Sequence, residues 1–184
     1  MEVCDGDTII IEPTSLRANE PKNQVEKKLC SYKVKLSPKY RKIRLLGIDA
    51  FEYHQNEYGP KAKDFLSMLI LNKQVCFETD VQVKDIYGRT LGYVFINEPT
   101  SLRTDEPMSL RANGLAELQR QLFINEELLK NGYAILYDFP PNIKYIDKLK
   151  KAQRYACQNM LGVWEKNSYI LETPSSWRHG HYHR

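Results

Sequence analysis

The order of extended and helical patterns along the chain restricts its fold more than any other feature of the sequence. Strand-like runs are concentrated in roughly the first hundred residues, one helical pattern lies among them, and two more follow. A doubly wound sheet would instead need regular alternation of strands and helices. The pattern therefore predicts an α+β fold.

Strands are indicated by β-branched runs and by alternation of apolar and polar residues. Four segments have these features: Thr8–Ile11, Lys39–Ile48, Gln74–Val83 and Thr90–Ile96. In the third segment, Val75, Phe77, Thr79 and Val81 share one face. The fourth follows a turn at Tyr87–Gly88. We expect all four to be strands.

Apolar residues at helical spacing predict three helices. The first has Pro60, which suits the first turn of a helix, and continues to about Ile70. The second is short, with Asn125 as the expected cap and Gly132 as the expected end. The third has an apolar face made by Tyr145, Leu149, Ala152 and Ala156.

An eight-residue unit occurs in three near-copies: Glu12–Asn19, Glu98–Asp105 and Glu106–Asn113. These copies carry too few large apolar residues to build a core, so we interpret them as loop insertions, at about residues 12–30 and 98–120. A duplicated peptide-binding motif is the alternative. We expect one domain over residues 1–168 and a tail over residues 169–184.

Composition restricts the partners and the compartment only loosely. The formal net charge is +4, which favours a polyanionic partner without requiring one. The four cysteines form no CxxC pair, which argues against a zinc site, and we expect Cys76 and Cys157 to be buried thiols. No apolar stretch is long enough to cross a membrane. Without a signal peptide the chain as written is expected to be intracellular, and secreted or periplasmic if its start lies upstream.

Residues that can carry chemistry gather in four clusters: Asp5–Thr8 (DGDT), Arg44–Glu52 (RLLGIDAFE), Asp85–Arg89 (DIYGR) and Leu161–Trp164 (LGVW). Asp7 and Asp49 each stand at the end of an expected strand, where side chains can converge. Two carboxylates, a backbone carbonyl and water molecules suit calcium, a hard cation that prefers oxygen ligands.

Three further residues suit phosphoryl chemistry. Glu52 lies three residues beyond Asp49, a spacing that suits a general base acting on water beside a metal. The guanidinium groups of Arg44 and Arg89 match the oxygens of a phosphoryl group as charge develops there. Each motif also has a structural interpretation, as a turn, a core strand or a surface charge. Their joint occurrence in this order favours catalysis.

Taken together, the four clusters resemble the staphylococcal nuclease family over about Val3 to Trp164, with the insertions set aside. Glu57–Pro60 and Asn125–Ala134 also resemble parts of the family's first and second helices. The resemblance implies an OB-fold, a five-stranded Greek-key β-barrel with three α-helices.

The resemblance also implies an activity, calcium-dependent endonuclease cleavage of DNA and RNA with little sequence specificity and with 3′-phosphorylated products. It implies that Asp7, Asp49 and the carbonyl of Ala50 hold Ca²⁺, with Asp5 close by. Glu52 would then act on the attacking water, and Arg44 and Arg89 on the phosphate. The aromatic residues Tyr87, Tyr137 and Phe139 resemble positions that border the nucleotide pocket, where stacking favours single-stranded or flexible substrate.

Several positions depart from the family pattern. Phe51 stands where the family usually has proline, and Ile86 replaces a basic or polar residue. The segment before DGDT is short, so the first strand is expected to be short as well. Pro174, Trp177 and Arg178 resemble a C-terminal extension of many bacterial members, in a tail that we expect to be solvated.

Two functions of different classes therefore remain. One is an active nuclease that works as a monomer. The other is a non-catalytic OB-fold module that binds nucleic acid or protein. The complete set of acidic and arginine residues favours the nuclease, because a module that only binds has no need for it.

Overall fold

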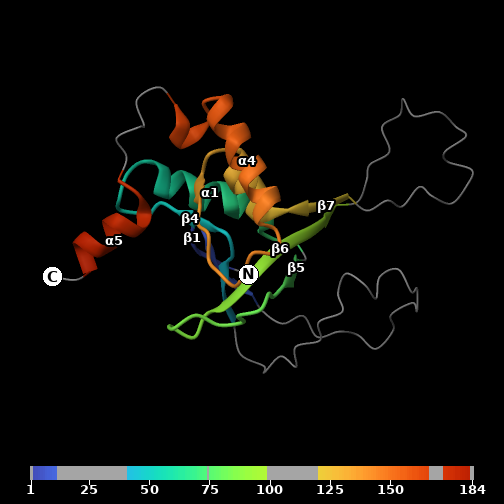
Figure 1. The fold of residues 1–184 in the computed structure, drawn as a ribbon. Helices are drawn as coiled ribbons and strands as arrows, with labels where there is room; N and C mark the ends of the chain where they lie inside the picture. The colour runs from blue at the N-terminus through green and yellow to red at the C-terminus, as the bar shows by residue number, and fades with distance from the viewer. Residues whose placement is uncertain (1, 12–40, 74, 99–119, 166–171, 183–184) are drawn as a thin grey trace, which may run out of the picture.

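The computed structural model describes residues 2–11, 41–73, 75–98, 120–165 and 172–182 (Figure 1). Most of the two expected insertions, at about residues 12–30 and 98–120, lies outside these ranges, as does Cys30. The insertions and the domain limits therefore stay predictions.

The described strands form one main sheet and one small sheet. The main sheet has the order β1–β2–β3–β6–β5, and β7 pairs with β6 beyond this path. The β3–β6 pair is parallel, and the other pairs of this sheet are antiparallel. The small sheet pairs β4 with β8. The strands are β1 (Glu2–Asp5), β2 (Thr8–Ile11), β3 (Arg41–Leu45), β4 (Ile48–Ala50), β5 (Val75–Glu78), β6 (Thr90–Glu98), β7 (Arg120–Phe123) and β8 (Ala134–Leu136).

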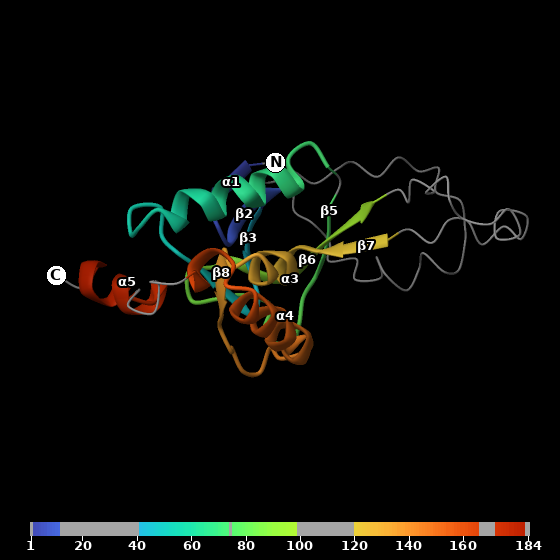
Figure 2. The same ribbon diagram turned by 90° about the horizontal axis from the view of Figure 1, so that it is seen from above.

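Helices α1 and α3 contact each other and share one apolar cluster with the strands of the main sheet, as the ribbon views allow the reader to follow (Figures 1 and 2). Helix α1 contacts β1, whereas α3 contacts β6 and α4. The helices are α1 (Tyr58–Ile70), α3 (Ile124–Lys130), α4 (Ile146–Gln158), the 3₁₀ helix η2 (Gly162–Trp164) and α5 (Pro174–Tyr182). The α+β prediction is therefore confirmed. The expectation of a solvated tail is correct only in part, because the described tail forms the helix α5, in which His179 and His181 are exposed but Pro174 is buried.

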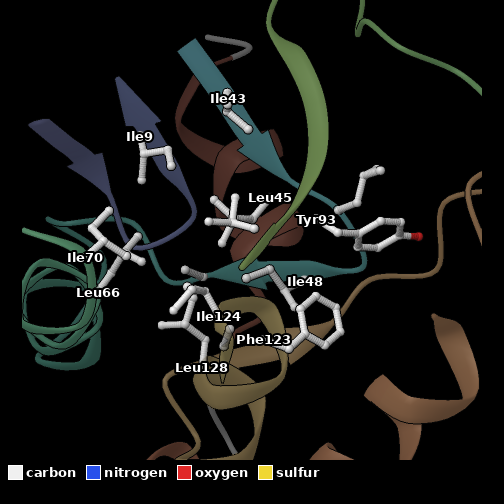
Figure 3. Packing of buried hydrophobic residues seen from close by; sticks show 14 of the residues in the cluster. Ile9, Ile43, Leu45, Ile48, Leu66, Ile70, Tyr93, Phe123, Ile124 and Leu128 are labelled. Atoms are coloured by element: carbon white, nitrogen blue, oxygen red, sulfur yellow. The ribbon is translucent and has the colours of Figure 1, made fainter. Parts of the chain in front are cut away.

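One apolar cluster fills the space between the main sheet and the helices (Figure 3). Ile9 and Ile43 come from the sheet, Leu66 comes from α1, and Leu128 comes from α3, and all four side chains are fully buried. Burying an aliphatic side chain of this size contributes about 1.5–3 kcal/mol. This cluster fixes β2, which Asp7 directly precedes, and β3, which carries Arg44.

Two predicted strands are shorter than expected. The segment Lys39–Ile48 is not one strand, because a turn at Leu46–Gly47 separates β3 from β4. Gly47 has a φ of 76°, which favours glycine, and a Cβ there would displace the end of the Leu149 side chain of α4. The predicted strand Gln74–Val83 ends at Glu78, and Val81 is exposed. The turn at Gly47 directs β4 away from β3.

The short first strand is present, as expected. Strand β1 has four residues and pairs with β2, placing Val3 opposite Ile9. Val3 is buried in the apolar cluster. The turn before β2 is thus attached to the sheet on both sides.

Cys157 is exposed on α4, so the prediction that it is buried was wrong. Cys76 in β5 is half-buried. Among the described residues, no helix is both long and apolar enough to cross a membrane.

Asn125 does not cap α3, contrary to the prediction. The helix begins at Ile124, and the Asn125 side chain is fully buried. Its amide oxygen accepts a hydrogen bond from the Val94 backbone N–H at 2.9 Å, and its amide nitrogen donates to the Leu46 carbonyl at 2.8 Å. Asn125 therefore joins α3 to β6 and to the turn before β4.

Asn125→Ala should lower the free energy of unfolding by about 2–5 kcal/mol, because it leaves two buried backbone groups without partners. Urea denaturation measures this effect. Asn159→Ala is the matched control, since this exposed amide donates to the Tyr155 carbonyl at the end of α4. It should cost less than about 1 kcal/mol. Equal costs for the two variants would contradict the bridging role of Asn125.

Candidate active site

Asp7, Arg44 and Asp49 meet where β2, β3 and β4 come together. Asp7 directly precedes β2, and Arg44 lies in β3 opposite Thr8 of β2. Asp49 is the middle residue of β4. The Leu45 backbone N–H donates to the Asp7 carbonyl at 2.9 Å, which ties the turn before β2 to β3. The strand register thus places both aspartates beside one arginine.

The Arg44 guanidinium bridges the two carboxylates. Its Nη1 lies 3.0 Å from Asp7 Oδ2, and its Nη2 donates to Asp49 Oδ1 at 2.8 Å. Nη1 also donates to the carbonyls of Leu45 and Ile48, each at 3.0 Å. The structure therefore brings together the three residues Asp7, Arg44 and Asp49, called here the acidic cluster. Their catalytic and metal-binding roles stay predictions.

Asp7 is also held by groups other than Arg44. The Thr8 hydroxyl donates to Asp7 Oδ1 at 3.0 Å, and the Ala50 backbone N–H donates to Asp7 Oδ2 at 3.0 Å. At the neighbouring Gly6, an added Cβ would lie 2.7 Å from the Cβ of Ala62, so glycine lets α1 pack closely on this turn. The Asp7 carboxylate is therefore oriented before any ligand binds.

Asp49 carries its charge in a buried position, with 1% of the residue exposed. Burial raises the pKa of Asp49 above its ordinary value. Among the charged neighbours, Arg44 and Arg178 lower this pKa, and the Asp7 carboxylate raises it. The net direction is upward, which means that the two arginines do not fully compensate the cost of the ionised form. A further cation beside Asp49 would stabilise the ionised carboxylate.

Glu52 lies in the loop after β4, and its neighbour Phe51 anchors this loop. Phe51 is buried with Tyr58 and Val163 in a second apolar cluster, and the Phe51 and Tyr58 ring centroids are 6.2 Å apart. Phe51 thus fixes the loop by packing, where the family usually has proline. The Glu52 side chain stays 22% exposed, so water can reach it.

Arg178 of α5 extends the acidic cluster to Glu52. Its Nη1 donates to Glu52 Oε1 at 2.8 Å, and its Nη2 donates to Asp49 Oδ1 at 2.9 Å and Oδ2 at 2.8 Å. Sequence analysis did not predict Arg178 as a site residue, because the tail was expected to be solvated. The available signal was its resemblance, with Pro174 and Trp177, to a C-terminal extension of family members.

Arg89 is held by its own loop rather than by the acidic cluster. Asp85 accepts hydrogen bonds from the backbone N–H groups of Tyr87 and Arg89 at 2.9 Å, and from Arg89 Nε at 2.6 Å. The Arg89 guanidinium also lies 5.5 Å from the centroid of the Tyr87 ring. Within the described residues, the Arg89 side chain contacts none of the acidic cluster.

The structure does not bring the remaining predicted site residues into contact with the acidic cluster, within the part of the chain that it describes. Tyr137 and Phe139, after β8, form a stacked pair with ring centroids 6.0 Å apart, and the Tyr137 backbone N–H donates to the Gly47 carbonyl at 3.1 Å. Tyr137 and Tyr87 are exposed. Asp5 ends β1, and in the described part of the chain its side chain makes no contact with the acidic cluster. The exposed aromatic faces are open to a stacking ligand.

The donor chemistry of the acidic cluster fits a hard divalent cation. Asp7 and Asp49 supply buried carboxylate oxygens on two sides of one guanidinium. The described ranges contain no group of three or more His, Cys, Asp or Glu side chains arranged to hold a metal. Calcium accepts about six to eight oxygen ligands, which include backbone carbonyls and water as well as carboxylates. The Ala50 carbonyl as a further ligand stays a prediction.

Comparison with known proteins identifies the family to which the chain belongs. A sequence model described as staphylococcal nuclease homologue matches residues 42–166. A thermonuclease of Staphylococcus hyicus is 27% identical over 169 residues, covering 89% of this chain and 73% of the relative. An uncharacterized protein of Methanocaldococcus jannaschii is 31% identical over 187 residues, covering 89% and 69%. Endonuclease YncB of Bacillus subtilis is 25% identical over 175 residues, covering 85% and 72%.

The family match covers more than half of the chain and includes Arg44, Asp49, Glu52 and Arg89. It confirms the OB-fold expectation. The described main sheet has six strands rather than the expected five, because β7 also pairs with β6, and α5 adds a fourth α-helix to the expected three. Several relatives carry nuclease names, which denote hydrolysis of phosphodiester bonds. The chain therefore belongs to the staphylococcal nuclease family.

Proposed function

We propose that this protein is a calcium-dependent endonuclease that hydrolyses DNA and RNA with little sequence specificity and leaves 3′-phosphorylated products. The observation that carries the proposal is the acidic cluster, in which Arg44 bridges the buried carboxylates of Asp7 and Asp49. Glu52 lies within reach of the same site, since Arg178 contacts both Glu52 and Asp49.

The metal-binding residues of the proposal are Asp7, Asp49 and the carbonyl of Ala50, with Asp5 as a weaker, more distant contributor. Bound calcium would supply a Lewis acid beside the scissile phosphate. The buried positions of Asp7 and Asp49 strengthen their interaction with a cation, because the surrounding dielectric is lower than that of water.

Glu52 is the proposed general base. It accepts a proton from water as the water oxygen bonds to phosphorus, and the bond between phosphorus and the 5′ oxygen then breaks. The electron pair of that bond leaves with the 5′ oxygen, which takes up a proton from solvent water. The partial exposure of Glu52 supports this role, because the attacking water must enter beside it.

Arg44 and Arg89 are proposed to bind the phosphate and to stabilise its developing charge. Within the described residues, the contacts of Arg44 run through Nη1 and Nη2, and the proposed phosphate contact would use its Nε–H. Arg89 lies outside the cluster, so substrate would have to connect the two arginines. Asp85 restricts the Arg89 side chain until then.

The proposed substrate is single-stranded or flexible nucleic acid, bound by a monomer. The stacked Tyr137–Phe139 pair and the exposed ring of Tyr87 support this preference. Stacking on an aromatic ring is tolerant of sequence, because every base has a π-face.

Digestion with and without calcium tests the proposal. We expect cleavage of plasmid DNA and RNA, and faster cleavage of a single-stranded oligonucleotide, in CaCl₂, and loss of all three activities in excess EGTA. Products with 3′-phosphates carry 5′-hydroxyl ends, which polynucleotide kinase labels directly. Undiminished digestion in EGTA would contradict the calcium requirement. Binding of the oligonucleotide without cleavage would instead support the non-catalytic OB-fold module.

A further inference from the structure

Helix α5 is attached to the acidic cluster by polar contacts. Arg178 donates to Asp49 and Glu52. At the start of this segment, the Gln55 side chain donates to the Glu172 carbonyl at 2.7 Å. Both ribbon views show α5 at the end of the molecule where the loop between β4 and α1 lies (Figures 1 and 2). In the described structure, α5 contributes no residue to either apolar cluster, and Pro174 is its one buried residue.

This kind of attachment can be released at low cost. A segment with few buried apolar contacts opens locally more easily than the core does. Arg178 supplies the three charge-assisted hydrogen bonds that join α5 to the site. Any group that displaces Arg178 from Asp49 therefore weakens the docking of the whole helix.

The Asp49 carboxylate has little capacity left while Arg178 is bound. Its Oδ1 accepts from Nη2 of Arg44 and from Nη2 of Arg178, and its Oδ2 accepts from the same Nη2 of Arg178. A carboxylate has about four lone-pair sites, so three are already taken. A divalent cation at Asp49 would also face two guanidinium groups at close range.

The formal charges lead to the same conclusion. The carboxylates of Asp7, Asp49 and Glu52 face the guanidinium groups of Arg44 and Arg178, three negative charges against two positive ones. Without Arg178, three negative charges face one positive charge, and the net −2 matches a divalent cation. Arg178 thus supplies part of the compensation that a metal would supply.

We infer that α5 is a calcium-displaced latch, in which Arg178 competes with calcium for Asp49 and calcium binding releases the helix. The inference rests on the calcium centre of the proposed function. It predicts that Arg178 weakens calcium binding although it lies outside the metal shell. It also predicts that calcium and α5 docking oppose each other, since two linked sites affect one another equally.

Calorimetric titration of CaCl₂ into the full-length chain, without nucleic acid, tests this competition. Arg178→Ala should lower the calcium Kd by about 5- to 150-fold, the usual range for coupled sites. Arg154→Ala is the matched control, because it removes an exposed arginine of α4 whose Nε donates to the Lys150 carbonyl. It should change the Kd by less than about twofold, since exposed charges at a distance are screened.

Amide hydrogen exchange gives a second readout that needs no variant. Calcium should speed exchange in residues 174–182 of the unaltered protein and leave residues 146–158 of α4 unchanged. An unchanged or higher Kd in Arg178→Ala, or slower exchange in α5 with calcium, would overturn the latch. Equal calcium Kd values for the unaltered protein and Arg178→Ala would overturn the latch alone. If neither of these two proteins bound calcium, the calcium centre would be overturned as well.

Discussion

Glu52→Gln should lower kcat for calcium-supported cleavage by about 10² to 10⁴-fold, the usual contribution of a general base. Glutamine has nearly the same shape as glutamate but cannot accept the proton of the attacking water. Calcium affinity should change by less than about tenfold, since Glu52 is assigned to water activation and not to the metal shell. Single-turnover cleavage of a short oligonucleotide measures the rate, and calorimetry measures the affinity.

The Glu52 test has to exclude an effect through α5. Glu52 accepts a hydrogen bond from Arg178, so its replacement also loosens the helix. Rates should therefore be compared at saturating calcium, where the proposed latch is already open. Glu57→Gln is the matched control, because Glu57 is an exposed carboxylate of the same loop that pairs with Lys61 at 2.6 Å. A near-normal rate for Glu52→Gln would assign water activation to another group.

Arg44→Lys and Arg44→Ala should both slow single-turnover cleavage by about 10² to 10³-fold, a typical loss for one donor to a developing charge. Lysine keeps the positive charge, but a point charge cannot reproduce the planar fork of the guanidinium. In the structure this fork contacts both carboxylates and two backbone carbonyls at once. Arg154→Ala, the exposed control on α4, should cleave at nearly the normal rate.

Arg44 also contributes to the stability of the fold. Unfolding measurements on the Arg44 variants should show this contribution separately from the effect on the cleavage rate. Removing one partner of a buried ion pair costs about 3–5 kcal/mol, because the other charge stays buried. Arg44→Ala should therefore lower the free energy of unfolding by that amount without calcium, and saturating calcium should restore part of it. Urea denaturation with and without calcium measures both effects. If Arg44→Lys cleaves at a nearly normal rate, Arg44 holds the cluster together but does not stabilise the transition state.

The fold class and the three residues at the centre of the site could be predicted from local sequence patterns. The α+β fold follows from local periodicity, which the chain carries in strands such as Thr8–Ile11 and in helices such as Tyr58–Ile70. The convergence of Asp7, Arg44 and Asp49 could be predicted because strand ends meet at one rim of a sheet. The family resemblance of the four motifs gave the OB-fold.

Local patterns were less informative where a single turn changes the path of the chain. Lys39–Ile48 has the composition of one strand, but Leu149 of α4 packs where a side chain at position 47 would lie, and the chain turns at glycine. Asn125 has the sequence context of a helix cap, but its amide is buried between β6 and the turn before β4. In both places a tertiary contact outweighs the local preference of the sequence.

The surroundings of the central residues could not be predicted, because they depend on contacts between distant segments. It separates Arg89 from the acidic cluster, because Asp85 binds the arginine within its own loop. It also brings Arg178 to Glu52, although the two residues are 126 positions apart. Periodicity reports which face of a segment is apolar and says nothing about which distant carboxylates an arginine will meet. That pairing depends on where α5 packs in the folded chain, and it is the contact on which the calcium latch rests.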